Sequence, residues 1–232
     1  MITSLSTLRQ GEVRIPCQEV QLEGDLVVPA GAEGLVLFAH GSGSSRLSPR
    51  NRFVAEEIHR KGVATLLFDL LTPQEALAEA RTGELRFDIP FLTRRLIDAT
   101  RWVQQDQSVA DMTGGLHIGY FGSSTGAAAA LAAAAAIPEI KAVVSRGGRT
   151  DLAGSAVEMV RAATLLIVGE RDLAVKEWNL ETLERLTGIK QLSIIPHATH
   201  LFEEAGALEK VAELAASWFE FHLAAPCPDK AS

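Results

Sequence analysis

The sequence predicts an α/β fold: a mostly parallel, doubly wound sheet of about eight strands with an antiparallel N-terminal hairpin and helices on both faces. Short runs of purely apolar residues recur along the chain, as in strands that are buried on both faces of a sheet. Segments with helical spacing lie between these runs. The length of 232 residues suits one large domain. We therefore expect a single domain over residues 1–232, with an ordered core over about 12–223 and a loose tail over 224–232.

The N-terminal segment predicts the hairpin. Residues 12–28 alternate between apolar and polar in short steps around Pro16 and Gly24, which is typical of an antiparallel pair at a sheet edge. The alternation then stops, and each later apolar run predicts one buried strand. These runs cover residues 34–39, 63–68, 116–121, 140–144, 164–168 and 192–195.

Helix signals fill the intervals. Ser48 followed by Pro49 is an N-cap and first-turn pair, and Gly62 closes the helix that they begin. Two further helices are indicated by apolar residues at helical spacing: Leu92, Leu96, Ala99 and Val103 in one, and Leu208, Val211, Leu214, Ala215 and Trp218 in the other. Residues 71–90 form the longest stretch without a strand, and we expect a small lid or an extra helix there.

Composition excludes several functional classes. A net charge of −7 argues against a nucleic-acid partner, because a phosphate-binding face needs clustered Lys and Arg. The longest apolar run, residues 127–137, is too short to span a membrane, and the N-terminus lacks the apolar core of a signal peptide. Cys17 and Cys227 alone make no disulfide framework. We expect a cytoplasmic protein, a monomer or homodimer, without nucleic-acid or membrane partners.

One pentapeptide carries a chemical signal. Gly122-Ser123-Ser124-Thr125-Gly126 matches the pattern G-x-S-x-G, and it lies between a predicted strand and a predicted helix. A nucleophilic serine in this pattern stands at the tip of a very tight turn, so that the positions two before and two after it must be small. The competing interpretation is a Gly/Ser turn before a merely Ala-rich helix. We expect Ser124 to be a nucleophile.

A serine nucleophile needs a base, and the base needs an orienting acid. The histidine comes from the loop after the last predicted strand, where His200 is preferred over His197. The acid follows the strand before it, where Asp172 is preferred over Glu170 because Glu170 is closer to the strand. Ser124, Asp172 and His200 then stand in the chain order serine, acid, histidine.

The remaining histidines predict no metal site. His59 and His222 fall on predicted helices and are expected at the surface, and His117 lies in a buried strand, where a hydrogen bond would satisfy it. No His, Cys or Asp grouping has the spacing of a zinc site. We expect no metal and no cofactor.

A loop of small residues follows the first buried strand. His40-Gly41-Ser42-Gly43-Ser44-Ser45-Arg46 can turn backbone amides toward a reacting carbonyl oxygen. We expect the oxyanion hole to combine the amides of Ser42 and Thr125, while His40 holds the loop by hydrogen bonding. A phosphate-binding loop is the alternative, but the segment matches neither of the glycine-rich nucleotide patterns.

Four segments resemble the α/β-hydrolase superfamily, and within it the dienelactone hydrolase-like family. They are FAHGSGSSR (38–46), GYFGSSTGA (119–127), LLIVGERD (165–172) and HATHLFEE (197–204), within a resemblance that covers about residues 12–223. The resemblance implies an α/β-hydrolase fold. Some members of this group are fused to a phosphoribosyltransferase domain, which we expect this chain to be too short to include.

Two features of the family bear on the substrate. Dienelactone hydrolases proper use a cysteine nucleophile, and Ser124 stands at that position here, which favours a general serine esterase. They also hold a substrate carboxylate with arginines, and Arg46 and Arg146 are the candidates for that role in this chain. Ion pairing within the protein, of Arg149 with Asp151 or of Arg146 with Asp69, is the alternative.

These observations predict a cofactor-free serine hydrolase acting on a small ester or lactone, with a shallow and open pocket lined partly by residues 71–90. His200 would deprotonate Ser124, and Asp172 would hold His200 in the right tautomer. An acyltransferase or peptidase of the same fold would share these residues. A non-catalytic protein of this fold that binds a small ligand is a third possibility, against which an intact set of three residues weighs.

Overall fold

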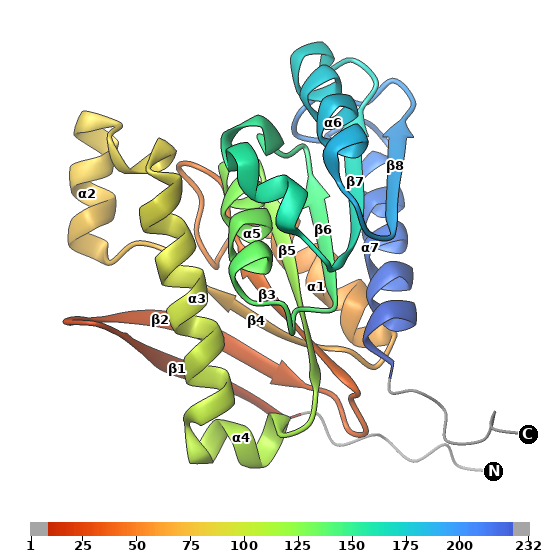
Figure 1. Cartoon of the computed structure of the whole chain (residues 1–232). Coiled ribbons are helices and arrows are strands. Elements are labelled where there is room, and N and C mark those ends of the chain that lie inside the picture. Colours follow the sequence, from red (N-terminus) through yellow and green to blue (C-terminus); the bar gives the residue numbers. More distant parts are fainter. Residues whose placement is uncertain (1–8, 225–232) are drawn as a thin grey trace, which may run out of the picture.

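The computed structural model describes residues 9–224, and an eight-stranded sheet forms its centre (Figure 1). The strands lie in the order β1-β2-β4-β3-β5-β6-β7-β8, and all neighbours from β4 to β8 run parallel. The predicted mostly parallel sheet with an antiparallel start is confirmed. The strands are β1 (Arg9–Cys17), β2 (Val20–Val28), β3 (Gly34–Ala39), β4 (Ala64–Phe68), β5 (His117–Ser123), β6 (Ala142–Arg146), β7 (Ala163–Gly169) and β8 (Lys190–Ile195).

The hairpin is one edge of this sheet. β1 and β2 pair antiparallel along their whole length, and Gln18, with a φ of 55°, lies in the turn between them. β2 pairs antiparallel with β4, which leaves β1 outermost. Pro16, which cannot donate to a strand partner, is tolerated because β1 is an edge strand.

Helices cover both faces of the sheet. α1 and α7 pack on one face, while α3, α5, α6 and η2 cover the other (Figure 1). Among the helices in residues 9–224, none is long and apolar enough to cross a bilayer. The helices are α1 (Pro49–Arg60), α2 (Pro73–Thr82), α3 (Ile89–Gln105), α4 (Gln107–Thr113), α5 (Thr125–Ala136), α6 (Leu173–Arg185) and α7 (Ala207–Leu223), with 3-10 helices η1 (Leu85–Phe87) and η2 (Thr150–Met159).

The alanine-rich α5 is the central helix of its face. It lies between the sheet, α3 and η2, and nine of its twelve residues are buried. A helix that is apolar all round is stable only when it is enclosed on all sides. Alanine meets this demand because it favours helix and lets neighbouring elements approach closely. The row of alanines therefore reflects the packing of the helix that follows Ser124.

The segment 71–90, for which a small lid or an extra helix was predicted, contains the helix α2. Thr72 caps α2 through its hydroxyl, which accepts from the amide of Glu75, and the Glu75 carboxylate accepts from the amide of Thr72. This reciprocal cap fixes where α2 begins. In Figure 1, α2 stands beside α3 and away from the strands of the sheet.

Several smaller predictions have mixed outcomes. His117 is satisfied as predicted, by the carbonyl oxygen of Leu223 at 3.1 Å. The surface position predicted for His59 is wrong, since it is half-buried, lies 2.6 Å from the Thr65 hydroxyl and has a pKa that burial lowers to about 4. His222 is also half-buried. Cys17 is a buried free thiol, and Cys227 lies outside the described residues.

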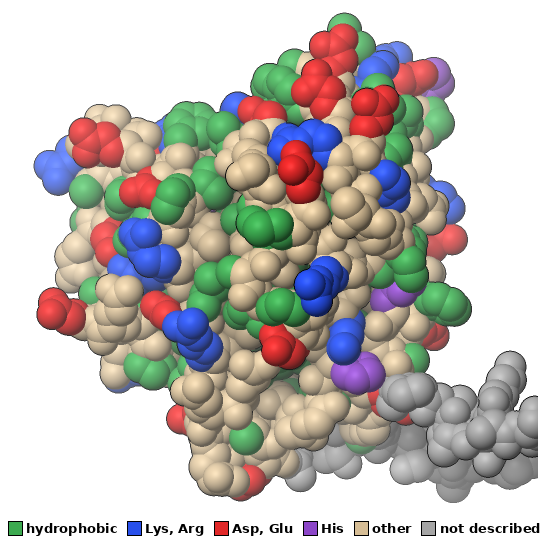
Figure 2. Space-filling view, viewed as in Figure 1, with side chains coloured by type: hydrophobic (Ala, Val, Ile, Leu, Met, Phe, Trp, Pro, Cys, Tyr) green, Lys and Arg blue, Asp and Glu red, His purple; other side chains and the backbone are tan. Residues whose placement is uncertain are grey.

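Charged side chains are mixed on the surface that faces the viewer. Figure 2 shows basic and acidic groups interspersed over this face, with small apolar areas between them.

Candidate active site

The predicted site residues gather at one edge of the sheet. Because β3, β5, β6, β7 and β8 run parallel, the segments that follow them leave the sheet on the same side. These segments are the loop 40–46, the turn at Ser124, the turn 147–149, the loop with Asp172 and the loop with His200.

Ser124 occupies a strained turn between β5 and α5. Its φ of 50° and ψ of −121° are unusual for a residue with a side chain. A Cβ atom on Gly122 would lie 2.4 Å from Cα of Ala127, and one on Gly126 would lie 2.1 Å from the carbonyl oxygen of Ala39. The chain therefore needs glycine at both positions, and strain of about 1–3 kcal/mol at Ser124 is retained by the surrounding packing.

The contact at Gly126 predicts a stability effect. Gly126→Ala is expected to lower the free energy of unfolding by about 1–3 kcal/mol or more, because the new methyl group meets backbone atoms that cannot move aside cheaply. Gly11→Ala is the matched control, since nothing lies within 4 Å of its Cβ position. Urea denaturation of both variants measures the difference. Equal midpoints for the two variants would contradict the steric reason given for this glycine.

His200 and Asp172 are brought into direct contact. Nδ1 of His200 lies 2.6 Å from Oδ2 of Asp172. A carboxylate at Nδ1 requires the proton on that nitrogen and leaves Nε2 free to accept another proton. Asp172 is held at the start of α6, and its side chain is 16% exposed against 39% for His200, so the pair is shielded on the carboxylate side.

The two alternatives to this pair bind each other. The Glu170 carboxylate accepts a hydrogen bond from the amide of His197 at 2.7 Å, and it lies 3.3 Å from Nδ1 of the same residue. The side chain of His197 is 76% exposed. Glu170 and His197 thus form a separate surface pair, while Asp172 and His200 face each other.

Ser124 and His200 border the same turn. The carbonyl oxygen of Arg146 accepts from the amide of Ser124 at 3.2 Å, and the amide of Arg149 donates to the carbonyl oxygen of Ser124 at 3.0 Å. Gly147, between them, packs against the His200 ring, whose Nδ1 lies 3.4 Å from the position of a Cβ on this glycine. Within residues 9–224 no hydrogen bond joins the Ser124 hydroxyl to His200. Such bonds are often long before a substrate binds.

The loop after β3 lies against the serine turn. A Cβ on Gly41 would be 3.0 Å from Cβ of Ser124, and the hydroxyls of Ser42 and Thr125 are 3.1 Å apart. Thr125 begins α5, so its amide has no acceptor within the helix. In the described part of the chain, the Ser42 amide also donates to no backbone carbonyl. Both amides belong to residues that border one small space.

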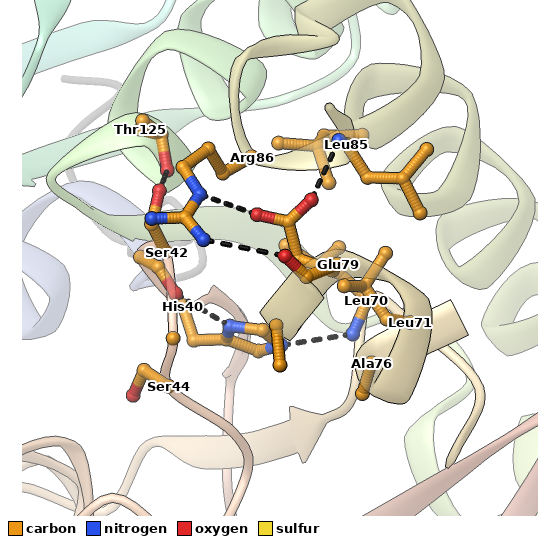
Figure 3. Close-up of a pocket in the computed structure, with 14 residues that line it drawn as sticks. His40, Ser42, Ser44, Leu70, Leu71, Ala76, Glu79, Leu85, Arg86 and Thr125 are labelled. Atoms are coloured by element: carbon orange, nitrogen blue, oxygen red, sulfur yellow. Dashed lines mark hydrogen bonds and ion pairs between the residues drawn. The ribbon is translucent and has the colours of Figure 1, made fainter. Parts of the chain in front are cut away.

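His40 holds this loop, as predicted. Its Nε2 accepts from the amide of Leu70 at 3.0 Å, and its Nδ1 donates to the carbonyl oxygen of Gly41 at 3.0 Å (Figure 3). Burial lowers the pKa of His40, which keeps the ring neutral. The ring therefore has no free nitrogen with which to transfer a proton.

The two arginines proposed for substrate binding have other surroundings. Arg46 lies 2.5 Å from Asp69 and 2.8 Å from Glu23, so the alternative that paired Asp69 with Arg146 is wrong. The alternative pairing of Arg149 with Asp151 is confirmed, at 2.9 and 2.8 Å.

Arg146 is buried without a partner for much of its guanidinium. It is 8% exposed, and its Nε and Nη1 form no hydrogen bond with any described residue. Burial, with the nearby Arg50, lowers the pKa of Arg146 to about 10. The alternation of β6 places its side chain on the face covered by α1 and α7, with Val144. A role of Arg46 or Arg146 in substrate binding stays a prediction without a contact that supports it.

A cavity of about 250 Å³ opens beside Ser42 and Thr125, between the loop 40–44, α2 and Leu92 of α3 (Figure 3). Sequence reasoning missed two charged residues in its wall, Glu79 and Arg86. They lie in the segment 71–90, which was predicted to line part of the pocket, but nothing in the sequence singled out these two residues. In residues 9–224, no group of three His, Cys, Asp or Glu side chains is placed to hold a metal ion.

Known proteins similar to this chain fall into two groups. No family model matches the sequence. A dienelactone hydrolase from Anabaena variabilis, of known structure, is 55% identical, with 93% of this chain and 99% of that chain covered and a TM-score of 0.89. The esterase Est1E from Butyrivibrio proteoclasticus is 17% identical over 91% of this chain and 98% of its own, with a TM-score of 0.74, and it supports the fold alone.

Curated relatives from two strains of Mycobacterium tuberculosis are similar in sequence but longer. Each is 52% identical over 222 residues and bears the provisional name phosphoribosyl transferase. The match covers 95% of this chain and 48% of each relative, so the chain spans about half of their length.

Proposed function

Because the chain belongs to the dienelactone hydrolase family of α/β hydrolases, we propose that it is a serine hydrolase that cleaves small carboxylic esters or lactones. Ser124 would be the nucleophile, His200 the general base and Asp172 the orienting acid. The observation that carries this proposal is the 2.6 Å contact between His200 Nδ1 and Asp172, made at the same sheet edge as the strained Ser124 turn. A histidine held in this tautomer can take a proton at Nε2.

The reaction would proceed in two halves. As the Ser124 hydroxyl attacks the carbonyl carbon, its proton passes to Nε2 of His200, and Asp172 stabilises the imidazolium. The imidazolium then protonates the departing alcohol oxygen. A water molecule, deprotonated by His200, attacks the acyl-enzyme, and the carboxylic acid leaves with Ser124 restored.

The negative charge that forms on the carbonyl oxygen needs donors. The amides of Ser42 and Thr125 are proposed to supply them, since neither has a backbone acceptor in the described fold and the two residues adjoin Ser124. One such donor contributes about 3 kcal/mol to lowering a barrier of this kind. The N-terminus of α5 lies at the same place and favours negative charge.

The name carried by the mycobacterial relatives differs from the hydrolase activity proposed here. We propose that phosphoribosyl transfer belongs to the half of those proteins that this chain does not match. The matched half corresponds to 95% of this chain, whose described part is one sheet with its helices.

Intact-mass spectrometry after treatment with a fluorophosphonate tests the nucleophile directly. We expect one adduct on the wild-type protein and none on Ser124→Ala, because only a hydroxyl with an adjacent base attacks this reagent rapidly. Ser123→Ala is the matched control, since Ser123 is the neighbouring serine but is only 2% exposed, and it should label as the wild type does. Failure of the wild type to label, or labelling of Ser124→Ala, would overturn the proposal.

A further inference from the structure

The cavity beside Ser42 and Thr125 is placed to receive an acyl group. Ser42 and Thr125, whose amides are the proposed donors to the carbonyl oxygen, both line this cavity, and Thr125 directly follows Ser124 in the chain. The cavity volume of about 250 Å³ corresponds to roughly eight groups of water size. Most of its wall is apolar, and this part consists of Leu70, Leu71, Ala76, Ala80, Leu85 and Leu92.

Charge in this wall is confined to one ion pair. Glu79, which is 5% exposed, accepts hydrogen bonds from Nε of Arg86 and from the amide of Leu85, the latter at 2.6 Å. Nη2 of Arg86 donates to the carbonyl oxygen of Glu79 at 3.3 Å. Figure 3 shows two nitrogens of the guanidinium turned toward Glu79 and the third pointing away from it.

The pair leaves the cavity without net charge. Burial raises the pKa of Glu79, but the hydrogen bonds from Arg86 and Leu85 outweigh this effect and hold that pKa below its usual value. The carboxylate therefore stays ionised and balances the guanidinium. His40, the other titratable residue in the wall, stays neutral because burial lowers its pKa.

A substrate carboxylate would meet opposing effects in this space. It would lose hydration in a largely apolar wall, and its attraction to Arg86 would be cancelled by repulsion from Glu79. A neutral aliphatic chain would instead gain from the burial of apolar surface against the leucines and alanines.

We propose that this site takes neutral acyl groups with up to roughly eight heavy atoms beyond the reacting carbonyl, and that Glu79 determines this specificity by neutralising Arg86 and repelling anionic acyl groups. This inference rests on the proposed serine hydrolase function. The proposed preference for neutral acyl groups differs from what the resemblance to dienelactone hydrolases proper implies, since those enzymes hold a substrate carboxylate with arginines.

Three esters of one chain length test the proposal on the wild-type protein. They are p-nitrophenyl hexanoate, the p-nitrophenyl monoester of adipic acid, and the p-nitrophenyl methyl diester of adipic acid. We expect the hexanoate and the methyl diester to be cleaved with similar kcat/KM. The monoester should be about 100-fold worse, because its carboxylate would lose hydration while Glu79 cancels the attraction to Arg86. A monoester that is cleaved as well as the methyl diester, or better, would overturn the proposal.

Variants locate the effect at the ion pair. In Glu79→Gln the charge of Arg86 is free, and the ratio of monoester to methyl diester is expected to rise by about tenfold or more. In the double variant Glu79→Gln/Arg86→Gln this gain should disappear, because no cation remains in the cavity. A ratio that stays at the wild-type value in folded Glu79→Gln would contradict a role for Glu79. The wild-type comparison stands on its own if that variant does not fold.

Fluorophosphonate labelling distinguishes a failure of the proposed acyl specificity from a failure of the proposed serine hydrolase function. If Ser124 reacts with the reagent while the monoester is the preferred substrate, the acyl specificity is wrong and the serine hydrolase stands. If Ser124 does not react and none of the three esters is cleaved, the proposed function itself is wrong, and the specificity falls with it.

Discussion

Ser124→Ala is expected to lower kcat/KM on p-nitrophenyl hexanoate by about 10⁴-fold or more. The variant lacks the atom that forms the acyl-enzyme, so that the remaining rate can come only from substrate binding and from the amides of Ser42 and Thr125. The fold should survive, since the positive φ of Ser124 suits alanine no worse than serine. Steady-state release of p-nitrophenol measures the loss.

The control for this variant lies one residue earlier. Ser123 ends β5, is buried and is not at the tip of the turn, so Ser123→Ala is expected to stay within a few-fold of the wild-type rate. Urea denaturation checks that both variants are folded. Activity of folded Ser124→Ala within tenfold of the wild type would remove Ser124 as the nucleophile.

The sheet could be predicted where burial is complete. The strand at residues 34–39 was predicted with the bounds observed for β3, because every residue in it is buried and the apolar run ends where the strand ends. At the other edge, β8 begins at Lys190, two residues before the predicted run. Its first residues are exposed, so an apolar pattern cannot mark them.

The spacing of apolar residues did not predict the short helix α4. The seven residues of α4 are too few to show a helical repeat. Its one clear signal is Asp106, whose carboxylate accepts from the amides of Ser108 and Val109. A single capping residue does not predict a helix unless a periodic apolar pattern follows it.

Some side-chain pairs could be predicted from the sequence and others could not. Asp172 and His200 could be paired from sequence, because each follows a strand of the same parallel sheet and the sheet brings their loops together. The partners of Arg46 could not be predicted from sequence. Glu23 comes from the antiparallel strand β2 and Asp69 from the loop after β4, and packing sets the directions of their side chains. Glu79 and Arg86 meet through the fold of residues 79–86, which no periodic pattern describes.

Asp172→Asn is expected to lower kcat by about 10³–10⁴-fold while changing KM little. An asparagine amide can donate to Nδ1 of His200, which moves the ring proton to Nε2 and removes the site that accepts the proton of Ser124. The carboxylate that stabilises the imidazolium is lost at the same time. Steady-state kinetics on p-nitrophenyl hexanoate measures the effect, and the rate of fluorophosphonate labelling should fall with it.

Glu170→Gln is the matched control, because it makes the same chemical change two residues away on the same loop. Glu170 accepts from the amide of His197, and within the described residues no hydrogen bond or ion pair joins it to His200, so its replacement should leave the fold intact and kcat within about threefold. His197→Ala should behave likewise. A larger loss of kcat in Glu170→Gln than in Asp172→Asn would mean that Glu170, and not Asp172, is the acid that orients the catalytic histidine. The exposed Glu170–His197 pair would then have to approach Ser124, which the 2.6 Å contact between Asp172 and His200 argues against.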